Sequence, residues 1–275
     1  MRQRLDGQRI ALFESRLAEE ISDLVRRSGG VPVCVPAVRE CRRPSHPEVA
    51  ALLTHLRSEA APVFVFSTGV GASALFDEAR ELGRLTELLD AISRGHAACR
   101  GPKAVAALHR EGVVASVKTR SPYTTTEFIE ALAGLDVRDR TVVLVHYGER
   151  NANLVDALMS SGSRLRELLL YQWELPEDTA PLASMVEDLV QGAFAAAAFT
   201  TQIQARNLIT MATRIGRREA LLTALRSQVV VAAVGPTCAG VLAEFGIPPQ
   251  VVPNTPKMAP MMNALVTRLV AGSFR

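Results

Sequence analysis

Small polar residues recur along the chain where a short apolar run gives way to an amphipathic stretch. These places are Glu14-Ser15-Arg16, Ser67-Thr68-Gly69, Gly101-Pro102-Lys103, Tyr147-Gly148-Glu149, Thr200-Thr201-Gln202 and Gly235-Pro236-Thr237. Each could simply cap a helix, because Ser and Thr are common N-caps and Pro is common in the first helical turn. As a set they favour anion binding, since open α/β sheets bind ligands at the carboxyl ends of their strands and helix starts expose N–H groups. Two such rims facing each other would form a cleft for a large polyanionic substrate.

Tyr171 is the second candidate for chemistry. It ends the apolar run Leu168–Leu170 and comes just before Trp173. A tyrosine in this place can close a hydrophobic core, which is its usual role. It can equally place a phenol in a cleft, where the hydroxyl donates a hydrogen bond or a proton. Both interpretations stay open from the residues alone.

A glycine motif favours a different chemistry. Gly69, Gly71 and Ala74 form GxGxxA directly after an apolar run, as in dinucleotide-binding turns. That use needs an acidic residue at the end of the next strand, and Asp90, at the right distance, lies in the predicted helix 85–93. We therefore expect these glycines to serve packing or a general anion-binding turn, with a nicotinamide-dependent enzyme as the lesser hypothesis.

The sequence gives little indication of a metal site or of a reactive cysteine. The histidines show no metal-ligand spacing, and His109 is expected on the surface of a helix; they are His46, His55, His96, His109 and His146. Cys34 and Cys99 lie in apolar runs and are expected to be buried, while Cys238 opens a helix without a predicted histidine neighbour. We expect no metal site and no cofactor.

Composition excludes several classes of protein. The chain has 275 residues, 48% of them hydrophobic, and a net charge of +3 from 31 basic and 28 acidic residues. This apolar share can fill a core, and so small a charge does not favour nucleic acid as a partner. No apolar run reaches the roughly 18–20 residues that span a bilayer. A soluble, cytoplasmic protein without a membrane partner is expected.

Short apolar runs alternate with amphipathic stretches such as 17–27, which predicts parallel sheets with helices on both faces. Ten strands are predicted: 9–13, 31–38, 62–67, 97–100, 113–117, 141–146, 164–171, 193–200, 229–234 and 250–253. At this length two sheets are favoured over one.

An internal repeat also favours two sheets. Phe66-Ser67-Thr68 corresponds to Phe199-Thr200-Thr201, and Gly101-Pro102 corresponds to Gly235-Pro236 at nearly the same offset along the chain. Similar offsets in the same order indicate a duplicated unit of about half the chain.

The ordered motifs resemble the uroporphyrinogen-III synthase family over about residues 9–270. The similar stretches are 14–20 with Gly29-Gly30, 64–71 with Leu75-Phe76, 101–103, 121–127, 147–149 with Asn153-Leu154, 170–178, 199–202, 234–238 and 256–258. No single stretch is diagnostic, and the resemblance rests on the set.

The resemblance implies two doubly wound α/β domains with parallel sheets, joined by two extended connections, with a cleft between them. The first domain would take residues 1–38 and 173–275, and the second would be inserted as 39–172. The first strand–helix–strand segment of each repeat would then lie in the domain built mainly by the other repeat.

The family cyclises hydroxymethylbilane, a linear tetrapyrrole with eight carboxylates, losing water and inverting the last pyrrole ring, without a cofactor. The resemblance implies Tyr171 as the catalytic acid. It implies substrate binding by Ser15, Arg16, Ser67, Thr68, Gly101, Lys103, Tyr147, Thr200, Thr201, Gln204, Gly235 and Thr237.

A monomeric enzyme is expected. Some relatives continue into a winged-helix DNA-binding domain and act as regulators. The alternative is therefore a sensor domain of the same fold, separated from such a partner, that binds a tetrapyrrole or another anionic metabolite without turnover.

Overall fold

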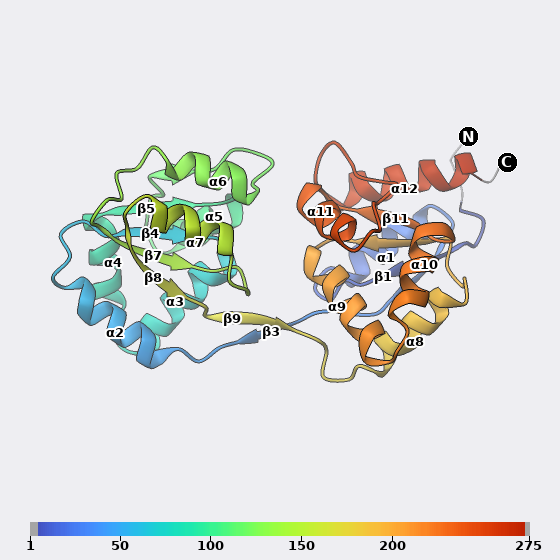
Figure 1. The fold of residues 1–275 in the computed structure, drawn as a ribbon, viewed down its shortest axis with the longest axis horizontal. Coiled ribbons are helices and arrows are strands. Elements are labelled where there is room, and N and C mark those ends of the chain that lie inside the picture. The colour runs from blue at the N-terminus through green and yellow to red at the C-terminus, as the bar shows by residue number, and fades with distance from the viewer. Residues whose placement is uncertain (1–4, 273–275) are drawn as a thin grey trace. The chain divides into compact units, whose positions relative to one another are not determined.

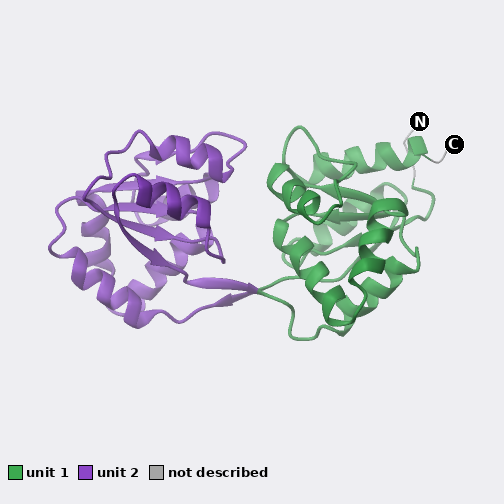
Figure 2. Cartoon of the chain, viewed as in Figure 1, with its two compact units in different colours: residues 1–39, 174–275 green, residues 40–173 purple. Residues whose placement is uncertain are grey.

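The structure is a computed structural model, and it describes residues 5–272. The chain divides into two compact units (Figure 2). Unit 1 comprises Met1–Arg39 and Glu174–Arg275, and unit 2 comprises Glu40–Trp173. The expected boundaries, after residues 38 and 172, each differ from these by one residue.

Unit 1 is a four-stranded parallel sheet in the order β11-β10-β1-β2. Its strands are β1 (Arg9–Leu12), β2 (Val31–Cys34), β10 (Ala196–Phe199) and β11 (Val230–Ala233). Its helices are α1 (Ala18–Arg27), α8 (Ala180–Val190), α9 (Gln202–Arg214), α10 (Arg218–Ser227), α11 (Pro236–Glu244) and α12 (Met258–Gly272). Alternate β1 residues enter two cores: Ala11 packs with α8–α11, whereas Ile10 and Leu12 pack with α1 and α12. Both faces of the sheet are thus covered.

Unit 2 repeats this plan with a five-stranded parallel sheet in the order β6-β5-β4-β7-β8. Its strands are β4 (Val63–Phe66), β5 (His96–Cys99), β6 (Val117–Lys118), β7 (Thr141–Val145) and β8 (Arg164–Leu168). Its helices are α2 (His46–Leu56), α3 (Gly69–Glu81), α4 (Leu85–Arg94), α5 (Pro102–Arg110), α6 (Thr125–Leu132) and α7 (Ala152–Ser160). Phe64 and Phe66 pack against α2–α5, and Val63 and Val65 against α6 and α7. The predicted α/β class with two doubly wound parallel sheets is confirmed.

The duplication is visible in the elements. Strand β10 repeats β4, helix α9 repeats α3, and helix α11 repeats α5, each pair at nearly the same offset along the chain. The copies exchange their first segments: β1 and β2 belong to the first copy but β1 pairs with β10, while β7 and β8 belong to the second and β7 pairs with β4. Each sheet is therefore built from both halves of the chain.

The chain passes between the units twice, and these passages form β3 (Arg39–Arg42) and β9 (Tyr171–Glu174), which pair as a two-stranded sheet (Figure 1). The sequence prediction missed both strands because it extended β2 to residue 38 and β8 to residue 171. Strand β2 ends at Cys34, close to Pro36, whose nitrogen cannot donate to a ladder. Strand β8 ends at Leu168, level with the end of β7, so Tyr171 begins β9 and does not end β8.

Three further predictions were wrong in detail. Residues 113–116 form a loop before the short β6, and Val114 is exposed, so it has no sheet face to bury. Residues 250–253 contribute one isolated bridge, from Val251 to Ala232. Tyr147-Gly148-Glu149 forms a turn and opens no helix, because α7 begins only after its cap at Asn151.

Candidate active site

The centre of unit 2's carboxyl edge carries several of the predicted site residues. Thr68 follows β4, and Tyr147 follows β7, the strand next to it in the sheet. Tyr171, at the start of β9, shares a hydrogen bond of 2.8 Å with the Thr68 hydroxyl. The structure thus brings Thr68 and Tyr171 into direct contact, although 103 positions separate them in the chain.

The Tyr171 side chain is enclosed, with 2% of the residue exposed. Its ring meets the edge of Trp173, with 5.3 Å between ring centroids, and Trp173 also lies 5.9 Å from the ring of Tyr147. Burial raises the pKa of the Tyr171 phenol well above its usual value, and the hydrogen bond with Thr68 offsets only part of this rise. The phenol therefore carries its proton at neutral pH and can act as an acid.

Thr68 is held in place by the helix that follows it. It is the N-cap of α3, where its hydroxyl accepts a hydrogen bond of 3.0 Å from the Gly71 N–H. That contact fixes the oxygen facing Tyr171 and satisfies one of the free donors at the helix start.

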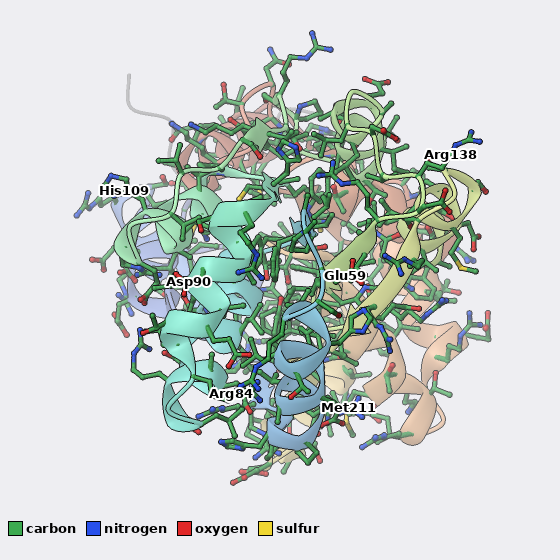
Figure 3. All side chains as sticks on the ribbon, turned by 90° about the vertical axis from the view of Figure 1, so that its left-hand side faces the viewer. Glu59, Arg84, Asp90, His109, Arg138 and Met211 are labelled. Carbon is green, nitrogen blue, oxygen red and sulfur yellow. The ribbon has the colours of Figure 1, made fainter. Side chains whose placement is uncertain are left out.

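The glycines of the GxGxxA motif are explained by packing. A Cβ atom on Gly69 would stand 2.5 Å from the Lys103 carbonyl oxygen, and one on Gly71 would stand 2.9 Å from Cγ1 of Val145. Asp90 lies in α4, as expected, and Figure 3 labels it there. The acidic strand end that dinucleotide binding requires is thus not supplied by this residue.

A cavity of about 520 Å³ opens beside Tyr171. It is lined by Glu40, Arg42, Gly69, Val70, Ser73, Ala74, Asp77, Lys103, Ala106, Arg110, Leu170 and Tyr171. The lining contains three basic and two acidic side chains, so the cavity suits a ligand that is anionic or carries charges of both signs. Of the predicted residues it collects Tyr171 and Lys103. Gly101 caps α5, and a Cβ on it would stand 4.0 Å from Cβ and Cγ of Tyr123.

In unit 1 an acidic residue already occupies the predicted anion site. One carboxylate oxygen of Glu14 accepts hydrogen bonds from the N–H groups of Ser15 and Arg16, both at 3.3 Å. Its other oxygen accepts from the Thr200 hydroxyl and from Nε2 of Gln204. Ser15 and Arg16 also do not open a helix, because α1 begins at Ala18. The sequence prediction of open N–H donors at this turn was wrong, since it did not foresee that Glu14 turns back onto them.

The remaining predicted residues of unit 1 act mainly in helix capping. Thr201 and Gln204 form a capping box at the start of α9, and Oε1 of Gln204 also accepts from the Thr200 N–H at 2.8 Å. Gly235 caps α11 and has room for no side chain, because a Cβ would stand 2.8 Å from that of Pro256. Thr237 is exposed in the first turn of α11.

A second cavity, of about 340 Å³, lies at the β7–β8 side of the same edge. His146 forms part of its wall, with Nε2 2.8 Å from a carboxylate oxygen of Glu167 and Nδ1 accepting from the Asn151 N–H at 3.4 Å. Burial lowers the pKa of His146, although Glu167 opposes this shift. Both ring nitrogens are occupied, so His146 has a structural role here.

One group of side chains among the described residues contains ligand types that could hold a metal ion. Potential ligand atoms of His46, Glu78 and Glu81 lie within 4.8 Å of one another. Arg42 already pairs with both carboxylates, at 2.7 Å from Glu78 and 2.6 Å from Glu81, so the group forms an ion-pair network that ties β3 to α3. The expected lack of a metal site stays a prediction.

The buried thiols of Cys99 and Cys238 are unsuited to nucleophilic chemistry. Burial raises the pKa values of Cys99 and Cys238 to about 12, which keeps both protonated at neutral pH. Cys34 is only partly buried, contrary to expectation, and its thiol contacts the Glu14 carbonyl. His109 is exposed on α5, as expected, and projects outward in Figure 3.

Sequence reasoning missed Arg100 and Trp173 as members of the site. Arg100 follows β5, and its guanidinium carbon lies 5.0 Å from the centre of the Tyr147 ring. The rule that selected Gly101, a position at a strand end, applies equally to Arg100. Trp173 lies in the unforeseen β9, so no signal in the sequence placed its ring between the two tyrosines.

Comparisons with known proteins agree with this architecture. The chain matches the family described as uroporphyrinogen-III synthase HemD over residues 19–263. It is 30% identical over 256 residues to the uncharacterized protein YjjA of Bacillus subtilis, covering 93% of this chain and 94% of that one. A mutant uroporphyrinogen III synthase from the bacterium Thermus thermophilus superposes with a TM-score of 0.76 at 26% identity, over 97% of this chain and 100% of that one. Uroporphyrinogen-III synthetase from Helicobacter pylori, 14% identical over 98% of this chain and 100% of that one, shares the fold with a TM-score of 0.53.

Proposed function

We propose that the chain, which belongs to the uroporphyrinogen-III synthase HemD family, is an enzyme that converts hydroxymethylbilane into uroporphyrinogen III. Membership confirms the resemblance seen in the ordered motifs. It also supports a place in tetrapyrrole biosynthesis and a small tetrapyrrole as the substrate. None of the described helices is long and apolar enough to span a bilayer.

The observation that carries the proposal is the protonated Tyr171 phenol, hydrogen-bonded to Thr68 beside a cavity with three basic side chains. Hydroxymethylbilane must first lose its hydroxyl group, and a general acid assists that step. The proton moves from the phenol to the hydroxyl oxygen, and the carbon–oxygen bond breaks to release water. The pyrrole nitrogen supplies electrons to the same carbon, which leaves a protonated azafulvene cation, and transfer of its N–H proton to the phenolate gives the neutral azafulvene and restores the acid.

Ring closure then depends on how the chain of pyrroles is held. The substituted carbon of the last ring must approach the azafulvene carbon, and fixing such a geometry lowers a barrier by several kcal/mol. We assign Lys103 in the cavity and the Thr68 hydroxyl to this positioning. In unit 1 a substrate carboxylate would have to displace Glu14 from the N–H groups of Ser15 and Arg16 and from the Thr200 hydroxyl.

The test is to supply hydroxymethylbilane and resolve the uroporphyrinogen isomers. The proposal expects the type III isomer, formed faster than the spontaneous type I product. Formation of type I alone, at the rate without protein, would refute the enzyme. Binding of the tetrapyrrole without type III product would instead support the sensor domain.

A further inference from the structure

Arg100 reaches across the centre of unit 2's carboxyl edge. It follows β5, and its backbone N–H donates to the Phe66 carbonyl of β4. Strand β4 lies between β5 and β7 in the sheet, yet the guanidinium carbon of Arg100 is 5.0 Å from the ring of Tyr147, which follows β7. The side chain therefore spans the end of β4 and lies over an aromatic face.

This guanidinium has no acidic partner among the described residues. Among residues 5–272, Arg100 forms no ion pair and no side-chain hydrogen bond, whereas Arg42 of the same unit pairs with two carboxylates. Loss of water around Arg100 lowers its pKa, and the groups that act against this shift are the phenols of Tyr147 and Tyr171. A cation withdrawn from water without a counter-charge is costly, so such an arrangement suits a site that an anion fills.

Two further donors of unit 2 lack acceptors within residues 5–272. Ser67 follows β4, and its hydroxyl is buried and has no hydrogen-bond partner in the part of the chain that the structure describes. The indole Nε1 of Trp173 is also buried and has no partner among the residues that the structure describes; it lies against Gly148, where a Cβ would stand 2.2 Å from it. Buried polar groups are nearly always paired, so two buried donors and a cation that have no acceptor among the described residues of this edge point to a missing one.

The internal repeat offers a comparison. One repeat later, Val234 stands where Arg100 stands, directly after β11 and before Gly235. The cation thus belongs to one copy of the duplicated unit, and the fold shared by both copies does not require it.

We propose that Arg100, with the donors of Ser67 and Trp173, forms a subsite in unit 2 for the carboxylate of a pyrrole. An arginine fork matches a carboxylate in shape, and the rings of Tyr147 and Trp173 offer faces to a planar pyrrole. The proposal rests on the proposed function for its ligand class, but binding here requires no turnover.

Trp173 makes the subsite measurable, because it is the chain's one tryptophan. Porphobilinogen, a single pyrrole with two carboxylates, is titrated into the intact protein while tryptophan fluorescence is recorded. We expect a saturable change in the wild type. Arg100→Gln should raise Kd at least about tenfold, and Arg100→Lys should give an intermediate value.

Arg138→Gln is the matched control, because Arg138 is an exposed arginine of unit 2 before β7, at the opposite end of that strand (Figure 3). Its Kd should equal that of the wild type. Thermal unfolding separates binding from structure: removing an uncompensated cation should leave Tm unchanged or raise it, whereas a structural arginine would lower it.

The outcomes separate this proposal from the proposed function. An unchanged Kd in Arg100→Gln, no fluorescence response in the wild type, or a lowered Tm in Arg100→Gln would overturn the subsite even if type III product forms. Arg100-dependent binding without type III product would support the subsite and refute the synthase.

Discussion

At the scale of single residues, the pairing of Tyr171 with Thr68 gives the phenol its chemical character. The hydroxyl of Thr68 serves both the cap of α3 and the phenol, so one side chain links the helix start to the candidate acid. Burial keeps the phenol protonated, which is the state that a proton donor needs. The two residues therefore have to be considered as one unit.

Tyr171→Phe should slow type III formation by about 10²-fold or more, because a positioned general acid contributes roughly 10²–10⁴-fold. Folding should be retained, since the ring and its contact with Trp173 remain. The raised pKa of Tyr171 keeps the acid protonated as pH rises, so the wild-type rate should show no loss from this group through pH ~10.

The measurement is an initial-rate assay across pH, with Tyr123→Phe as control. Tyr123 is an exposed tyrosine of the same unit, and its variant should match the wild type. An unchanged rate in Tyr171→Phe would remove Tyr171 from the proposed chemistry.

At the scale of elements, helices α3 and α5 meet where Gly69 faces the backbone of Lys103. The carbonyl oxygen of Lys103 would lie 2.5 Å from a Cβ on Gly69, and a backbone atom cannot move aside as a flexible side chain can. The same contact places Lys103 and Gly69 on one cavity wall. Glycine in this motif thus sets the spacing of two helices that carry site residues.

Gly69→Ala should lower the free energy of unfolding by about 1–3 kcal/mol through overpacking. Gly240→Ala is the matched control: Gly240 lies inside α11 with nothing within 4 Å of its Cβ position, so alanine there should stabilise by about 0.5–1 kcal/mol. Urea unfolding measures both. Equal effects of the two changes would contradict the packing role of Gly69.

At the scale of the whole molecule, sequence order and structural order differ because the repeats exchange segments. A repeat runs along the chain as one half, but each sheet takes strands from both halves. Unit 2 nevertheless remains continuous in sequence, as Glu40–Trp173, with all five strands of its sheet and its own cores.

A fragment of residues 40–173 should therefore fold alone and unfold cooperatively. A fragment of residues 1–133, cut at the repeat boundary after α6, should not, because it separates β1 from β10 and β4 from β7. Circular dichroism during heating distinguishes the two. A cooperative transition in 1–133 equal to that in 40–173 would refute this view of the fold.

Local pattern in the sequence was enough to predict the two parallel sheets and the duplication, but it placed Tyr171 at the end of β8, whereas Tyr171 begins β9. Apolar runs of strand length and helical periodicity are properties of neighbouring residues, so they can be read without coordinates. The same local signals located Thr68, Lys103 and the cap formed by Thr201.

Only the tertiary structure determines which of these residues are in contact and what electrostatic environment surrounds each of them. Local pattern did not show that Tyr171 contacts Thr68, or that Glu14 accepts hydrogen bonds from the N–H groups of Ser15 and Arg16. It also did not show that Arg100 lacks an acidic partner in the described part of the chain. Burial and pairing set the energy of a polar group, and neither is a property of its sequence neighbours. For that reason the sequence could predict anion-binding turns, but only the fold shows that Glu14 occupies the turn in unit 1 and that Arg100 of unit 2 has no acidic partner within residues 5–272.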